Sequence, residues 1–180
     1  MHWKSIRLKQ KQSWGWAIEV MGSLYERLYV SAQDFASARS YALHLLKKGW
    51  HSAPYQRRGS IYMQQSAFTT ALIVSYARPF TKGKGWPMFP ENLVQFNDSE
   101  ALLHKRILDL RHQVYAHSDS ASYSIRPFKM ADNAYSDVVG APFLLLKKDE
   151  CELIVGIIDG IFRRLRPELE KLRMELAVSH

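Results

Sequence analysis

The sequence predicts an all-α fold, a helical bundle of about five helices with a small β-hairpin inserted before the last helix. Apolar residues recur every three or four positions over several long segments, which is typical of amphipathic helices. A Pro- and Gly-rich loop at 79–98 separates two of these segments, and a short alternating pattern lies between about 120 and 148. A chain of 180 residues with 47% apolar residues is expected to form one domain, 1–180.

Two helices are predicted in the first 49 residues. The first covers about 13–30, and the second starts near Asp34, which suits an N-cap, and stops at Gly49. Two lysines precede the glycine and suit the negative end of the helix dipole. Residues 1–12, approximately, are left as a basic N-terminal arm. The apolar stripe of the first helix consists of Trp16, Val20, Leu24 and Leu28.

The third and fourth predicted helices flank the loop. The third spans about 60–77 and ends before Pro79, because the residue before a proline disfavours helical backbone. The fourth begins near Ser99, which is followed by Glu100, an acidic residue that suits a first helical turn.

The loop at 79–98 has two possible roles. It carries Lys82 and Lys84 among aromatic residues, a mixture that can grip phosphates and stack on bases. On that interpretation Lys82, Lys84 and Trp86 are candidate nucleic-acid ligands. The alternative, which we favour slightly, is that Trp86 and Phe89 only pin the loop to the core.

The hairpin region, about 120–148, precedes the last helix. Its first strand alternates polar and apolar residues around Pro127, and the apolar run at 138–146 can pair with it. The last helix is predicted over about 149–176, with one continuous apolar stripe. Pro167 is expected to kink or split it.

The charge distribution favours a polyanionic partner. The net charge is +8, and residues 1–84 carry thirteen Lys/Arg against three Asp/Glu, a balance of +10. A solvated basic surface without a partner is an equal alternative. The single cysteine, Cys151, excludes an intrachain disulfide and is expected to be a small buried residue. Since no secretory signal or membrane-length apolar run is present, we expect a cytoplasmic protein without membrane contact.

The most polar helix end in the sequence is LRHQVYAHSD, residues 110–119. His104 and Arg111 are seven residues apart and differ by only about 20° around a helix, whereas Arg111 and His117 are roughly 120° apart. A straight helix therefore cannot aim Arg111 and His117 at one phosphate without the long reach of the arginine side chain, a loosened last turn or a second copy of the chain. On the residues alone we favour the alternative that the cluster stabilises the helix end. His117 continues an apolar seam formed by Leu103, Ile107, Leu110 and Val114.

The run RHQVYAHSD resembles the signature of HEPN domains, in which an arginine is followed by four to six residues and a histidine. Arg111 and His117 occupy these positions, and His112 fills the polar position after the arginine. SYARPF, which contains Arg78, followed by a Pro-rich loop and LHKRILDLRHQVYAHSD, is also similar to that superfamily. The resemblance covers roughly residues 57–119 and implies a helical bundle.

The resemblance further implies a metal-independent endoribonuclease that acts as a homodimer, of a bacterial toxin or phage-defence type. Arg111, His112 and His117 would be catalytic, with supporting roles for His104, Tyr115, Asp119 and Arg78. RNA is the implied substrate, no metal or other cofactor is needed, and an antitoxin or a neighbouring defence protein is the implied regulatory partner. Two alternatives stay open: a non-catalytic HEPN-like module that binds RNA or a protein, and a structural subunit.

Overall fold

The structure is a computed structural model that describes residues 2–51, 58–112, 124–132, 134–140 and 146–178. These residues form four α-helices, two short 3-10 helices and one antiparallel hairpin that precedes the last helix. The elements in chain order are α1 (His2–Lys48), α2 (Gly59–Ala77), η2 (Arg78–Phe80), η3 (Glu91–Leu93), α3 (Asp98–Leu110), β1 (Ser124–Ala131), β2 (Ala134–Gly140) and α4 (Lys148–Val178). The predicted all-α bundle with a small hairpin is confirmed at this level.

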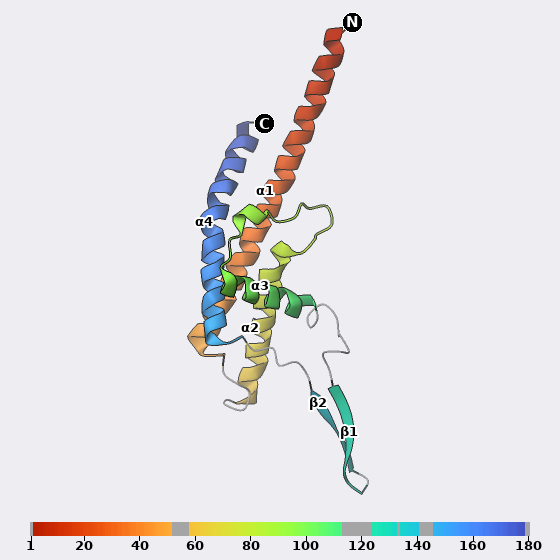
Figure 1. The fold of residues 1–180 in the computed structure, drawn as a ribbon, viewed down its shortest axis with the longest axis vertical. Helices are drawn as coiled ribbons and strands as arrows, with labels where there is room; N and C mark the ends of the chain where they lie inside the picture. The colour runs from red at the N-terminus through yellow and green to blue at the C-terminus, as the bar shows by residue number, and fades with distance from the viewer. Residues whose placement is uncertain (1, 52–57, 113–123, 133, 141–145, 179–180) are drawn as a thin grey trace.

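The core lies where α1 packs along both α4 and α2, with the short α3 crossing beside them (Figure 1). Most of its buried side chains come from these helices, because each carries an apolar stripe that no single helix can bury. The loop between α2 and α3 adds Phe89 and Leu93 to the same core. None of the described helices is both long and apolar enough to cross a membrane.

The prediction of two helices before Gly49 is wrong, because α1 runs unbroken from His2 to Lys48. The expected cap, Asp34, instead lies inside the helix and pairs with Arg78, with 3.1 Å between Oδ1 and Nη1. Nothing around Asp34 interrupts a helix, since no proline or glycine lies nearby. The predicted stop at Gly49 is confirmed.

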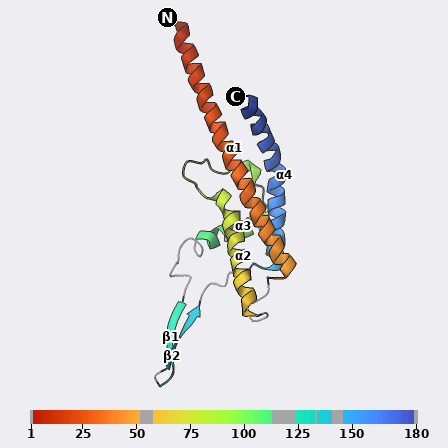
Figure 2. The same cartoon turned by 180° about the vertical axis from the view of Figure 1, so that it is seen from behind.

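The predicted apolar stripe of the first helix is buried only in part. Leu28 is fully buried, whereas Trp16 is 68% exposed and Val20 47% exposed. The N-terminal part of α1 extends beyond the rest of the molecule in both views (Figures 1 and 2), which explains the exposure. The start at His2 also places the predicted basic arm within the helix backbone.

The boundaries of α2 and α3 follow the predicted signals closely. α2 ends at Ala77, and a single turn at Arg78–Phe80 carries Pro79. α3 begins with a capping box: the Asn97 side chain accepts from the Glu100 N–H, and the Glu100 carboxylate accepts from the Asn97 N–H, each at 2.9 Å.

The hairpin pairs Ser124 with Gly140 at one end and Ala131 with Ala134 at the other. Its second strand starts four residues before the predicted one, and the hairpin stands apart from the helices in both views (Figures 1 and 2). α4 is not split at Pro167, which is exposed. Leu165 and Leu169, on either side of the proline, are buried and hold both halves against the core.

Candidate functional site

The described end of α3 places Arg111 and His112 next to each other at the surface. Arg111 Nη1 lies 3.5 Å from His112 Nδ1, the outer limit of a hydrogen bond. The backbone N–H of Arg111 is shared between the carbonyls of Ile107 and Leu108. Arg111 and His112, which directly follow α3, form a wider, π-helical turn. The predicted site residues Tyr115, His117 and Asp119 lie outside the described residues.

One helical face joins this pair to a pocket beneath the loop. His104 and Leu108 line the pocket, and Arg111 follows on the same face, because it is seven residues after His104. The pocket has a volume of about 460 Å³ and a mainly apolar lining with one carboxylate. Its remaining lining residues come from the segment 80–96 and are Phe80, Met88, Phe89, Glu91, Val94 and Phe96.

His104 is held among aromatic rings and one hydroxyl group. The centroid of its ring lies 4.5 Å from that of the Phe80 ring, in an edge-to-face arrangement, and 4.6 Å from that of the Phe96 ring. Tyr76 Oη lies 3.0 Å from His104 Nδ1. Burial lowers the pKa of His104, so the imidazole is neutral at pH 7. Burial likewise raises the pKa of Tyr76, which therefore stays a phenol.

The direction of the Tyr76–His104 hydrogen bond follows from the burial of Tyr76. The Tyr76 side chain is fully buried, and its hydroxyl would keep an unused proton if it only accepted from Nδ1. Leaving a buried donor unused costs about 1–3 kcal/mol. We therefore assign the hydroxyl as the donor and Nδ1 as the acceptor, which places the ring proton on Nε2. In this form Nε2 of His104 is a hydrogen-bond donor.

The loop at 79–98 is anchored to α1 by Arg27. Nη2 of this buried arginine donates to the carbonyls of Arg78, Pro79 and Thr81, at 3.4, 2.5 and 3.0 Å. Its guanidinium also lies over the Trp86 ring, 5.6 Å from the centroid. Burial lowers the pKa of Arg27.

The contacts of the loop match the pinning interpretation for its aromatic residues. Phe89 is 5% exposed and packs edge to face against Phe35, and Trp86 is half-buried against Arg27. Lys82 and Lys84 are exposed on the same loop, so their side chains are accessible to a ligand.

The predicted supporting residue Arg78 has a structural contact. It pairs with Asp34, and its side chain is 60% exposed. Within the described parts of the chain, no hydrogen bond or ion pair joins Arg78, Lys82 or Lys84 to the pair of Arg111 and His112.

Two further features concern metal binding and the lone thiol. No group of three or more His, Cys, Asp or Glu in the described ranges could hold a metal ion. Cys151 is fully buried, and burial, followed by the charges of Asp149 and Glu152, raises its pKa to about 12. The thiol is therefore unreactive at neutral pH, and Cys151 acts as a packing residue.

Sequence reasoning missed Tyr76, which contacts His104, and Glu91, which lines the same pocket. It also missed a group of arginines between α1 and α4. The run FRRLRP, residues 162–167, was a usable signal, since it places three arginines within four positions. Comparison of the chain with protein-family models, curated proteins and solved structures found no match.

Proposed function

We propose that this protein is a HEPN-like, metal-independent endoribonuclease that acts as a cytoplasmic homodimer. The observation that carries the proposal is the surface pair of Arg111 and His112 at the end of α3, on the helical face that also lines the His104 pocket. This arrangement supplies phosphate-binding and proton-transfer groups beside a pocket suited to a ring. His117, the histidine of the sequence motif, completes the proposed catalytic set.

The chemistry requires no metal. The 2′-OH of one nucleotide attacks the adjacent phosphorus, and the bond from phosphorus to the 5′-oxygen breaks. His117 removes the 2′-OH proton or protonates the leaving oxygen, since imidazole titrates near neutral pH. Arg111 stabilises the charge on the phosphoryl oxygens through paired N–H donors. His112 contributes a further hydrogen bond or proton.

The His104 pocket supports RNA as the substrate. A base that enters it would meet the rings of Phe80 and Phe96, which favour stacking. The Nε2–H group of His104 would donate to a base acceptor, and the exposed Glu91 carboxylate would accept from an amino group. His104 and Arg111 are about 10 Å apart along the helix axis, so base and phosphate contacts would fall on successive parts of one strand.

The homodimer is proposed from the geometry of the motif. On a straight helix Arg111 and His117 would be roughly 120° apart, so a single straight helix would not aim both at the same phosphate. A second protomer would remove this mismatch by supplying the other residue. An antitoxin or neighbouring defence protein is the proposed regulator of such an enzyme.

The test is cleavage of single-stranded RNA in excess EDTA. We expect the wild type to cleave, and Arg111→Ala and His117→Ala each to reduce the rate roughly 10²–10⁴-fold, as general acid–base and charge-stabilising groups do. Lys105→Ala is the matched control, because Lys105 is an exposed cation on the same helix. Full cleavage by both site variants would overturn the proposal.

A second candidate function is RNA binding without cleavage. The balance of +10 over residues 1–84 and the exposed Lys82 and Lys84 favour it. It predicts retention of RNA in a shift assay, with affinity that falls steeply with salt, and no product in any condition. Product formation by the wild type separates the two candidates.

A further inference from the structure

A second polar pocket lies between α1 and α4, apart from the residues of the proposed RNase site. It has a volume of about 600 Å³, and its charged lining is Arg39 from α1 with Asp159, Arg163 and Arg166 from α4. Three guanidinium groups and one carboxylate thus share the pocket. Arg39 and Asp159 are 120 residues apart in the sequence, so only the folded chain brings these charged groups together.

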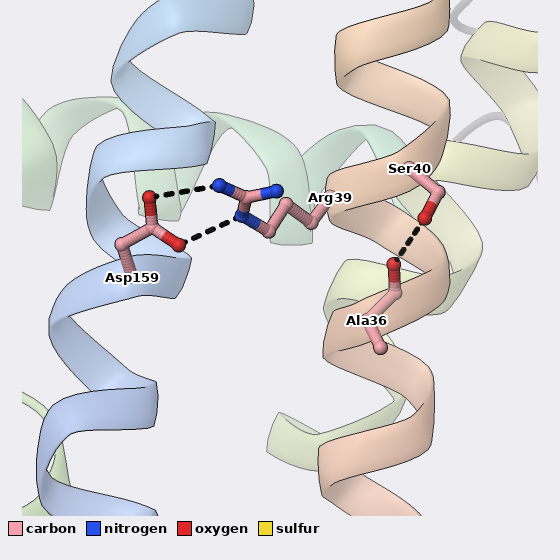
Figure 3. A network of polar contacts seen from close by, with 4 residues as sticks. All are labelled: Ala36, Arg39, Ser40 and Asp159. Carbon is pink, nitrogen blue, oxygen red and sulfur yellow. Dashed lines mark hydrogen bonds and ion pairs between the residues drawn. The ribbon is translucent and has the colours of Figure 1, made fainter.

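Arg39 is held in place by a two-point ion pair with Asp159 (Figure 3). Nε lies 2.7 Å from Oδ1 and Nη2 lies 3.2 Å from Oδ2. Both carboxylate oxygens are therefore engaged, and the hydrogen bond raises the pKa of Arg39. The bonds use one edge of the guanidinium, so Nη1 keeps its donors for another acceptor.

Arg163 and Arg166 give the pocket an excess of positive charge. Both are exposed, and neither forms an ion pair within the described residues. The Arg166 guanidinium lies over the Phe162 ring, 5.5 Å from its centroid, which restricts its orientation. Arg163 Nη2 reaches back toward Gly160, to 3.6 Å from the position that a Cβ would occupy. The local balance of three cations against one anion is +2.

We propose that this pocket binds a phosphate group. Arginine presents paired N–H donors that match phosphate oxygens, and two guanidiniums without acidic partners in one pocket repel each other until an anion lies between them. The Ser40 hydroxyl at the same pocket donates to the Ala36 carbonyl at 2.9 Å, so the arginines are the donors for the ligand. The phosphate can belong to an RNA backbone or to a small phosphorylated molecule.

The test compares two double variants of the full chain. Arg163→Gln/Arg166→Gln removes the two arginines without acidic partners, and Arg58→Gln/Arg126→Gln removes two exposed arginines elsewhere, so both lose the same charge. Binding of pyrophosphate and of a short single-stranded RNA is measured for each by titration calorimetry. We expect pyrophosphate binding to weaken at least tenfold in the pocket variant and to stay within twofold in the control.

The outcomes also identify the source of the phosphate. If RNA is the ligand, the pocket variant loses at least tenfold in RNA affinity. The slope of log affinity against log salt concentration also becomes shallower, by the equivalent of about one to two phosphate contacts. If a small molecule is the ligand, only pyrophosphate binding falls. Equal losses in both double variants, or no pyrophosphate binding by the wild type, overturn the proposal. RNA cleavage by the pocket variant is measured separately, because this site does not depend on the RNase activity.

Discussion

Replacement of Tyr76 by phenylalanine isolates the hydrogen bond that fixes His104. The substitution removes one oxygen atom from a fully buried side chain and leaves the ring in place. The contacts of the Tyr76 ring with the rings of Phe35 and Phe80 are therefore retained, and no cavity as large as a methyl group forms. The substitution therefore removes only the 3.0 Å hydrogen bond between Tyr76 Oη and His104 Nδ1.

The expected loss of stability is about 1–2 kcal/mol. A typical intramolecular hydrogen bond contributes about 0.5–1.5 kcal/mol net, and Nδ1 of the half-buried His104 is left with a poorer partner. In a chain of this size each kcal/mol corresponds to roughly 2–4 °C in Tm. Removing the donor to the neutral ring should also raise the pKa of His104, since that bond disfavours the charged form.

The measurement is urea unfolding followed by circular dichroism, with Tyr135→Phe as the control. Tyr135 is 74% exposed on the hairpin, so its hydroxyl should contribute less than about 0.5 kcal/mol. Nitrogen-15 chemical shifts of His104 report the protonated nitrogen directly. A Tyr76 variant as stable as the control, or a wild-type ring protonated at Nδ1, would refute the assignment of donor and acceptor.

Three other perturbations have signs fixed by the structure. Burial lowers the pKa of His104, so the unfolded state binds a proton more readily than the folded state does. The free energy of unfolding should therefore fall as the pH drops below about 6.5 towards the folded-state pKa. His104→Asn should flatten this part of the stability–pH curve, measured by urea unfolding. Pro167→Ala should raise the free energy of unfolding by about 1–3 kcal/mol, because an exposed proline inside α4 removes a helical hydrogen bond, and a decrease would show that the proline favours packing. Gly49→Ala should lower the free energy of unfolding by about 1–2 kcal/mol and thereby lower Tm, because Gly49 has a φ of 64° after α1 and alanine is strained there. An unchanged Tm would contradict this.

The parts of the fold that the sequence predicts are those governed by local signals. The stop at Gly49 is one, because a left-handed residue there allows the N–H of Gly49 to bond Leu46 and that of Trp50 to bond Leu45. The start of α3 is another, since Asn97 and Glu100 cap each other within four residues. Local rules fail at Asp34, because they predict a cap there, whereas its partner Arg78 is 44 residues away in the sequence.

The candidate site divides in the same way. Helical spacing alone predicts that His104 and Arg111 share a helical face and that Leu103 and Ile107 lie on one apolar seam, and both of these seam residues are buried in the structure. The protonation of His104 was beyond prediction, because it depends on Tyr76, 28 residues earlier in the chain. For the arginine pocket the run FRRLRP is visible in the sequence, but its position beside Arg39 is not, since no local pattern relates residues about 120 positions apart.

The anchoring of the loop by Arg27 has a consequence for the order of folding. One side chain on α1 holds three carbonyls that lie 51, 52 and 54 residues further along the chain. Closing so long a loop costs entropy before its contacts form, so the segment at 79–98 should become ordered only after α1 and α2 have docked. The wall of the His104 pocket is part of that segment. Ligand-binding capacity should therefore appear in the last kinetic phase of refolding, after most helical signal has returned.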